Sequence, residues 1–487
     1  MISKSDEDAP AGVPPEDIAE PKNEDSGEAA ESSPPGAAAG EKRASSMLGP
    51  FVAVCVVIFV VFFFNKRGPE EPPPGQQEKL AVLLQETQEA VTPVPDAGEP
   101  KVFEESTATV EGAPTWRRIF GGAADEEAMS IGRTSGGALI VGGWTGSFGK
   151  EEREGWIVKL DADGKEIWSK TYGGACDHSA ASVRETSDHG FIAGGSAGNG
   201  TASNAWIVKI DSNGAETWSK TFGASGEDNC TGILQTADGG YAFTGRTSSP
   251  GTEKSDAWLV KIDSNGNEVW NKTYGIGNHN GADAIAQTGD GGYALTGVTV
   301  SSEGGQSDFW IVRTDGTGRE IWSRTFGKGV DGRGRAILPT RDGGLLAVGE
   351  IQQKSEAGTC ALLVKVDENG KELWIRTFGD GGDRATSVLE AEDGDYVVAG
   401  YTLSSGNTNG SVWLAGFDAE GNRIWTRTCG DILEGRGYSV REAPDGGYVV
   451  AGSALSAGSG RRGALLIKVD ARGNPAADNP PSANKHP

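Results

Sequence analysis

The chain has 487 residues, a formal net charge of −25 at pH 7 and 5 cysteines. This acidic balance excludes a nucleic-acid-binding protein that neutralises phosphates, because such a protein needs a basic face. With 75 glycines and 22 prolines the chain is rich in turns, which favours an all-β protein with many tight connections.

The first 112 residues contain three segments that we predict to lie outside any globular domain. Residues 1–46 are acidic and almost free of large apolar side chains, so they are predicted to be disordered. Residues 47–64 carry no charge and would form a helix of about 27 Å, which predicts one transmembrane helix. A cleaved secretory signal is disfavoured because the segment starts far from the N-terminus and lacks a cleavage site. Residues 65–112, rich in Pro and Glu, are predicted to be a linker.

Tryptophans recur at intervals of 50 to 52 residues through the rest of the chain. They are Trp116, Trp168, Trp218, Trp270, Trp322, Trp374 and Trp425. All but the first follow an Asp-x-x-Gly turn, and Asp470 opens one more such turn. A period near 50 that opens with half a repeat and ends with the complementary half indicates a closed ring of repeats.

Each repeat has the local pattern of four antiparallel strands. In residues 231–274, strands are predicted at 232–235, 241–244, 258–262 and 269–274, separated by turns that contain Asp, Asn and Gly. Such a sheet needs cover on both faces, which radial stacking of blades supplies. We therefore predict an all-β fold, a seven-bladed β-propeller of four-stranded antiparallel blades over residues 113–470. An N-terminal strand at 116–120 closes the ring, and residues 471–487 form a disordered C-terminal tail.

Three short phrases carry a resemblance to a known family. They are Thr-Ala-Asp-Gly-Gly-Tyr at 236–241, Trp-Leu-Val-Lys-Ile-Asp at 258–263 and Trp-Asn-Lys-Thr-Tyr-Gly at 270–275. These resemble the repeats of bacterial and archaeal surface β-propellers in the quinoprotein-like superfamily. Lysines and arginines are nearly balanced across residues 47–64, so charge alone does not orient the helix. The resemblance implies a single-pass membrane protein whose propeller is periplasmic or extracellular.

We expect no cofactor and no metal ion. Quinoprotein dehydrogenases have eight blades and often an adjacent cysteine pair, whereas this chain has seven repeats and no adjacent cysteines. The turns at Asp161, Asp211 and Asp263 are similar to the start of an EF-hand loop, but none has the glutamate at the twelfth position. We interpret these aspartates as caps of hairpin turns. Cys176 and Cys230 are the only cysteines that we expect within disulfide reach.

Seven residues are candidates for ligand binding. Six acidic residues shortly precede the first strand of a blade and are expected near one mouth of the channel: Asp125, Asp177, Glu227, Asp331, Asp383 and Glu434. Such carboxylates would hold a cation, repel an anion, or serve only as turn caps and solvated loop residues. Trp144 is the one tryptophan outside the repeat register, and we expect it either to anchor a ligand or to pack locally.

The sequence contains no catalytic motif that we can identify, so we favour a non-enzymatic protein. The long loops are expected on one face of the ring, which makes that face the predicted contact surface. We expect a membrane-anchored binding scaffold for a protein or a cell-envelope polymer. The alternative is a carbohydrate-binding or carbohydrate-active propeller, a lectin or a glycosidase.

Overall fold

The structure, a computed structural model, describes residues 101–110, 113–149, 153–199, 202–224, 226–248, 254–275, 279–300, 305–327, 329–353, 358–379, 381–402, 410–429, 432, 434–456 and 459–475. The predicted acidic tail at 1–46, the predicted transmembrane helix at 47–64 and most of the predicted linker lie outside these residues. In the part of the chain that is described, no helix is long and apolar enough to cross a membrane.

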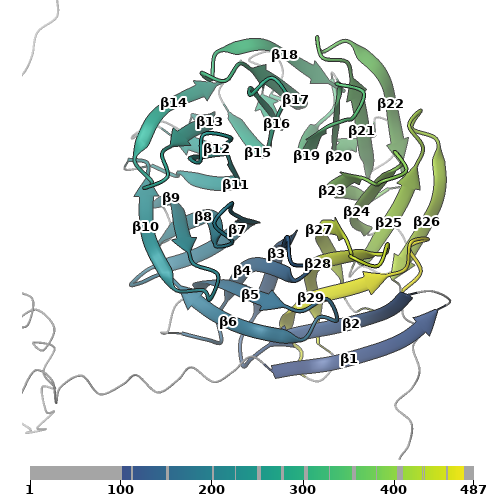
Figure 1. Ribbon diagram of the computed structural model, residues 1–487. Coiled ribbons are helices and arrows are strands. Elements are labelled where there is room, and N and C mark those ends of the chain that lie inside the picture. The colour runs from purple at the N-terminus through teal and green to yellow at the C-terminus, as the bar shows by residue number, and fades with distance from the viewer. Residues whose placement is uncertain are drawn as a thin grey trace, which may run out of the picture. The chain divides into compact units, whose positions relative to one another are not determined.

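The described residues form seven antiparallel sheets arranged as a ring around a central channel, and all their regular elements are strands (Figure 1). In each blade the first strand lines the channel and later strands lie progressively further out. The predicted all-β, seven-bladed propeller of four-stranded antiparallel blades is confirmed.

The strands of the first four blades have the following bounds. Blade 1 contains β3 (Glu126–Arg133), β4 (Leu139–Thr145), β5 (Glu154–Leu160) and β6 (Glu166–Tyr172). Blade 2 contains β7 (Asp177–Glu185), β8 (Phe191–Asn199), β9 (Ala202–Ile210) and β10 (Glu216–Phe222). Blade 3 contains β11 (Asn229–Gln235), β12 (Tyr241–Ser248), β13 (Ser255–Ile262) and β14 (Glu268–Tyr274). Blade 4 contains β15 (Asn280–Gln287), β16 (Tyr293–Val300), β17 (Ser307–Thr314) and β18 (Glu320–Phe326).

The remaining blades use both ends of the described chain. Blade 5 contains β19 (Gly332–Pro339), β20 (Leu345–Gln352), β21 (Thr359–Val366) and β22 (Glu372–Phe378). Blade 6 contains β23 (Arg384–Glu390), β24 (Tyr396–Thr402), β25 (Ser411–Phe417) and β26 (Arg423–Cys429). Blade 7 contains β27 (Arg436–Glu442), β28 (Tyr448–Leu455), β29 (Arg462–Val469), β2 (Ala113–Gly121) and β1 (Lys101–Val110).

Blade 7 joins strands that are far apart in the sequence. β2 pairs antiparallel with β29, with Trp116 opposite Lys468 and Phe120 opposite Ala464. β1 falls within the range predicted as linker, and it pairs antiparallel with β2 as a fifth strand. This pairing uses backbone groups of β2 that would otherwise form an open sheet edge.

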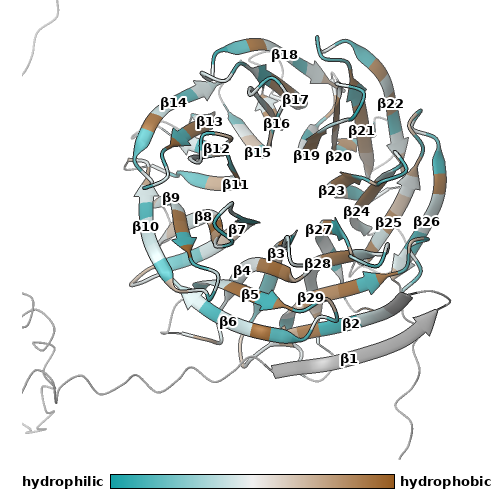
Figure 2. Ribbon diagram, viewed as in Figure 1, coloured by the Kyte–Doolittle hydropathy of each residue, from teal (hydrophilic) through white to brown (hydrophobic). Residues whose placement is uncertain are grey.

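Hydrophobic residues gather on the middle strands of each blade, whereas the outer strands are mixed (Figure 2). β29 shows why: seven of its eight residues are buried, because neighbouring blades cover both faces of the sheet. On the outer strand β14, by contrast, only Tyr274 is buried. Continuous burial replaces the alternating pattern that a sheet with one wet face would show.

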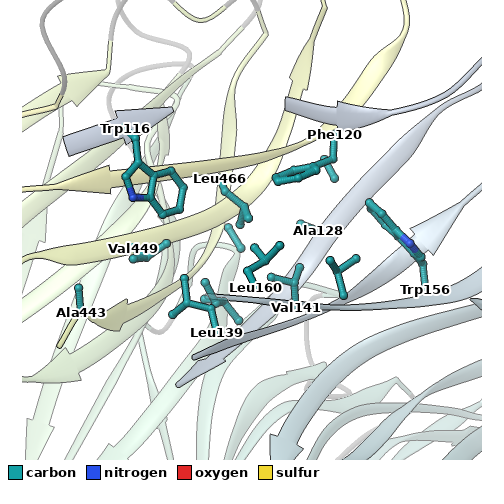
Figure 3. Close-up of a cluster of buried hydrophobic side chains, with 14 residues drawn as sticks. Trp116, Phe120, Ala128, Leu139, Val141, Trp156, Leu160, Ala443, Val449 and Leu466 are labelled. Carbon is teal, nitrogen blue, oxygen red and sulfur yellow. The ribbon is translucent and has the colours of Figure 1, made fainter. Parts of the chain in front are cut away.

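A buried cluster joins blade 7 to blade 1 (Figure 3). Trp116 and Phe120 from β2 meet Leu466 from β29 on one side, and Leu139 and Trp156 from blade 1 on the other. Each of these side chains is at most 3% exposed. Full burial of one such side chain contributes about 1.5–3 kcal/mol before the entropy cost, so burial at this junction stabilises the contact between blades 7 and 1.

Each repeat tryptophan of an outer strand packs over a glycine of the next blade. The glycine ends the Asp-x-x-Gly turn, has a φ between 74° and 78°, and would place a Cβ within 3.2 Å of the indole ring. The pairs are Trp116 with Gly164, Trp168 with Gly214, Trp218 with Gly266, Trp270 with Gly318, Trp322 with Gly370, Trp374 with Gly421, and Trp425 with Gly473. The strict spacing of Trp and Asp-x-x-Gly therefore reflects contacts between blades.

Candidate functional site

The two faces of the ring differ in the length of their connections. We call the face that carries the crossovers between blades, such as 173–176, and the loops that leave the second strand of a blade, such as 146–149, the long-loop face. The opposite face carries tight turns such as Asp161–Gly164, which closes with a backbone hydrogen bond of 3.0 Å. The innermost strands start at the long-loop face and surround a channel cavity of about 470 Å³.

Three of the predicted acidic residues hold neighbouring blades together at the long-loop face. Asp177 accepts a hydrogen bond of 3.0 Å from the backbone amide of Arg153, which precedes β5 of the previous blade. Asp331 accepts one of 2.8 Å from the amide of Ser307 and one of 3.0 Å from its hydroxyl. Asp125 accepts one of 3.0 Å from the amide of Arg462. These carboxylates cap the third strand of the preceding blade.

Glu434 and Glu227 occupy the equivalent position in blades 7 and 3. Glu434 forms an ion pair of 2.9 Å with Arg462. Glu227 is exposed, and its backbone amide donates a hydrogen bond of 2.6 Å to Ser248 Oγ. These two residues and the three strand caps are thus distributed one per blade junction.

Asp383 occupies a different position, one residue further along its blade. Its amide donates a hydrogen bond of 2.9 Å to Thr359, as Asp228 does to Ser203 in blade 3. Both aspartates are buried, at 4% and 1% exposure. In blade 3 the Asp228 carboxylate accepts bonds from Ala224, Thr247 and Ser248, which fixes the crossover.

The six acidic residues do not converge on one point. Within the residues that the structure describes, no group of three or more His, Cys, Asp or Glu side chains could hold a metal ion. The hydrogen bonds of Asp125, Asp177 and Asp331 are those of structural caps. A ligand-binding role for the six residues stays a prediction.

Trp144 lies near the end of β4. It is half-buried, and the guanidinium of Arg153 stacks over its ring at 3.7 Å from the centroid. It pairs with Glu127 of β3, so its counterparts in other blades include Arg246, Glu350 and Tyr401. Both expectations for Trp144 stay open, since it packs on Arg153 and is only half-buried.

The turns that are similar to EF-hand openings are closed by their own aspartates. Asp161 Oδ1 accepts hydrogen bonds from the amides of Asp163 and Lys165, at 2.9 and 2.8 Å. Asp211 and Asp263 repeat this pattern with the residues two and four positions later. The interpretation as hairpin caps is confirmed.

The possible disulfide between Cys176 and Cys230 is not formed. Cys230 is buried and lies against the neighbouring blade: a Cβ added at Gly194 of β8 would lie 2.4 Å from its sulfur. Burial raises the pKa of the Cys230 thiol, so this side chain packs as a small neutral group.

A cluster of arginines at the channel mouth was missed in the sequence. Arg333, Arg384 and Arg436 occupy one repeat position in blades 5, 6 and 7, as their pairing with Glu350, Tyr401 and Ser453 shows. Superposing the repeats residue by residue would have revealed this, because each arginine comes one residue before the small residue that starts the bulge of the inner strand. The overall acidity of the chain conceals this local excess of positive charge.

We define the mouth cluster as Arg333, Arg335, Arg384 and Arg436 together with Asp283, Glu350 and Tyr401. Arg333, Arg335 and Arg384 line a second cavity of about 440 Å³ at the long-loop end. Arg436 is not among the residues that line this cavity. Arg333 binds Asp283 through two nitrogens, and Arg335 binds Glu350 at 2.7 Å. Burial would lower the pKa of Arg335, but Glu350 and Asp283 raise it above its ordinary value.

Arg384 and Arg436 are held differently. Both guanidinium groups lie 5.8 Å from the centroid of the Tyr401 ring. Arg384 forms a long ion pair with Glu350, with 3.9 Å between Nη1 and Oε1. Arg384 Nε is buried and has no hydrogen-bond partner among the described residues. The mouth cluster therefore contains four guanidinium groups and two carboxylates, and two of the cations lie over the same tyrosine ring.

No protein-family model matches the chain, and no curated protein is similar to it in sequence. Solved structures are similar in fold. Sqt1 from Chaetomium thermophilum, bound to the N-terminus of ribosomal protein L10, aligns over 72% of this chain and 87% of its own, at 13% identity and a TM-score of 0.44. YCF48 from Cyanidioschyzon merolae aligns over 75% and 98%, at 13% identity and a TM-score of 0.41. BBS1N in complex with ARL6DN aligns over 73% and 96%, at 10% identity and a TM-score of 0.40. The repeat family suggested by the motifs stays a prediction.

Proposed function

We propose that the protein is a membrane-anchored, extracytoplasmic, non-enzymatic scaffold that binds an acidic segment of a partner protein at the long-loop face. The predicted span at 47–64 supports the anchoring, and the resemblance of the repeats to those of surface propellers supports the orientation. The mouth cluster supports the binding site. The observation that carries the proposal is the pair of guanidinium groups, Arg384 and Arg436, that both lie over the ring of Tyr401.

The chemistry of the mouth cluster matches acidic side chains. Arginine presents a planar fork of donors that suits carboxylates, and arginine with tyrosine is enriched where proteins bind each other. Arg333 and Arg335 already have carboxylate partners in Asp283 and Glu350. Arg384 and Arg436 lie over an aromatic ring, and Arg436 also hydrogen-bonds to Tyr438. A guanidinium has five N–H donors, so both arginines keep donors for a ligand.

The proposal is tested by measuring binding of a fluorescent hexaglutamate peptide to the full-length protein, with hexaglutamine as the neutral control. We expect the double variant Arg384→Ser/Arg436→Ser to weaken hexaglutamate binding at least about tenfold, and binding to fall as salt is raised. The same peptide is then used to compete with partners crosslinked in intact membranes.

A matched control removes two positive charges from the opposite face. Arg319 and Lys371 are exposed residues of tight turns in blades 4 and 5. The double variant Arg319→Ser/Lys371→Ser changes the net charge by the same amount and should leave binding unchanged. Equal loss in both double variants would show that only the overall charge matters, and the proposed site would be wrong.

The carbohydrate alternative has one supporting feature, the aromatic residues Trp144 and Tyr401 at the same repeat position of two blades. Three contacts count against it: Arg153 covers one face of Trp144, and both Asp177 and Asp331 are engaged as strand caps. Glycan binding that Trp144→Ala abolishes, or hydrolysis that Asp177→Asn or Asp331→Asn abolishes, would favour this alternative.

A further inference from the structure

Two arginines that the mouth cluster does not include line the interior of the channel. Arg184 of β7 and Arg441 of β27 lie at the same repeat position, five residues after the position that the mouth arginines occupy. They belong to blades 2 and 7, which flank blade 1. Blade 1 has Gly132 at this position, so no side chain stands between the two arginines there. Both arginines line the cavity of about 470 Å³.

Neither arginine forms an ion pair with a carboxylate among the described residues. Arg184 donates to the carbonyl of Val183 at 2.7 Å and to Ser130 Oγ at 3.4 Å. Arg441 donates to the carbonyl of Val440 at 2.7 Å. The buried lysines among the described residues are paired with carboxylates, as Lys365 is with Asp342 at 2.6 Å. The channel pair departs from that pattern.

The electrostatics of the pair are unfavourable without a ligand. Burial and the nearby charge of Arg441 lower the pKa of Arg184 to about 9, and burial lowers the pKa of Arg441. Two like charges that have lost part of their hydration and have no counterion cost free energy. Sites that sacrifice stability in this way are typical of ligand binding.

Hydroxyl groups next to the arginines add further donors. Ser130, Ser182 and Ser387 each accept a backbone amide from the next blade, at 3.3, 3.4 and 3.1 Å. A hydroxyl that accepts an N–H keeps its own proton to donate. The opposite wall of the cavity has an apolar part, with Ile285 and Ile337, beside the paired Asp283 and Arg333. The cavity therefore combines a donor-rich, cationic side with a wall that is partly apolar.

We propose that the channel is a binding site for a small organic anion, whose carboxylate or phosphate group lies between Arg184 and Arg441 and whose body lies against the apolar part of the wall. The cavity volume is within the range of about 300–1,000 Å³ that is usual for small-molecule sites. Arg333, Arg335 and Asp283 of the mouth cluster also line this cavity, but the Arg184–Arg441 pair is distinct from Arg384 and Arg436, and the proposal does not depend on the scaffold function.

The test is calorimetric titration of the full-length protein with succinate and, separately, with inorganic phosphate, at constant ionic strength. We expect saturable binding of at least one anion, and the stronger of the two identifies the head group. Arg184→Gln and Arg441→Gln should each weaken this binding at least about tenfold, whereas Arg184→Lys, which keeps the charge, should weaken it less. Arg324→Gln, an exposed arginine of the outer strand β18, is the control and should bind as the wild type does.

A second measurement separates a binding role from a structural role. Because the pair is uncompensated, Arg184→Gln and Arg441→Gln without ligand should unfold at a temperature no lower than the wild type. Absence of saturable binding of both anions, equal binding by the glutamine variants, or a clear loss of unfolding temperature in both variants would each overturn the proposal. The hexaglutamate assay of the mouth cluster reads a different pair of arginines, so the two proposals fail independently.

Discussion

The contact between Gly318 and Trp270 allows a quantitative test of how neighbouring blades are joined. Gly318 has a φ of +78°, and a Cβ added there would lie 2.7 Å from Cζ3 of Trp270. Gly239 has nearly the same backbone conformation, with a φ of +83°, but a Cβ added there would meet nothing within 4 Å. Gly318→Ala and Gly239→Ala therefore share the backbone cost and differ only in the clash with the indole.

The expected magnitudes follow from these two terms. A left-handed conformation costs a residue with a Cβ about 1–2 kcal/mol, so Gly239→Ala should lower the free energy of unfolding by that amount. Overpacking against a ring adds about 1–3 kcal/mol, so Gly318→Ala should lower it by about 2–5 kcal/mol. The added methyl has no easy escape from the ring, because Cγ of Lys272 lies 3.1 Å from the same Cβ position.

The assay is urea denaturation of both variants and the wild type, followed by tryptophan fluorescence. A change in midpoint with an unchanged slope reports a change in stability alone. If both variants lose the same free energy, the contact between indole and glycine does not join the blades, and the explanation of the Trp and Asp-x-x-Gly spacing is refuted.

Two further predictions concern the ion pairs between the first turn and the third strand of a blade. Asp342→Ala should lower the free energy of unfolding by about 1–3 kcal/mol, because it leaves the buried Lys365 ammonium without its charged partner. Lys365→Met should lower it by less, because it removes the buried charge itself. Chemical denaturation measures both free energies, and a larger loss for Lys365→Met would contradict this reasoning. Hydrogen bonds from Thr236 and Lys261 lower the pKa of Asp238 to about 2, although burial acts in the opposite direction. Hydrogen bonds from Thr288 and Arg313 lower the pKa of Asp290 to about 2 in the same way. Since the folded pKa is depressed, this stability is present above about pH 4 and is lost between about pH 4 and 2. Asp238→Asn/Asp290→Asn should flatten the fall of unfolding temperature over this range, and an unchanged pH profile would contradict the assignment.

The sequence was sufficient for the architecture because the fold is repetitive. The spacing of Trp270 and Trp322, and of the turns at Asp263 and Asp315, reports contacts that recur in every blade. A pattern seen seven times averages out local exceptions, so the count of blades and the order of strands were both predictable. β1 was not, since residues 101–110 lie outside the repeats and only the free edge of β2 explains why they pair there.

The proposed binding sites depended on tertiary structure for a different reason. Residues one repeat apart in sequence, such as Arg384 and Arg436, become neighbours only when adjacent blades stack, and their contact with Tyr401 needs side-chain positions. Acidic residues drew attention in the sequence because they recur shortly before the first strand of a blade, yet Asp177 and Asp331 are engaged with backbone amides. Repetition in one dimension therefore determined the fold, whereas charge balance at the channel was decided by which side chains converge in three dimensions.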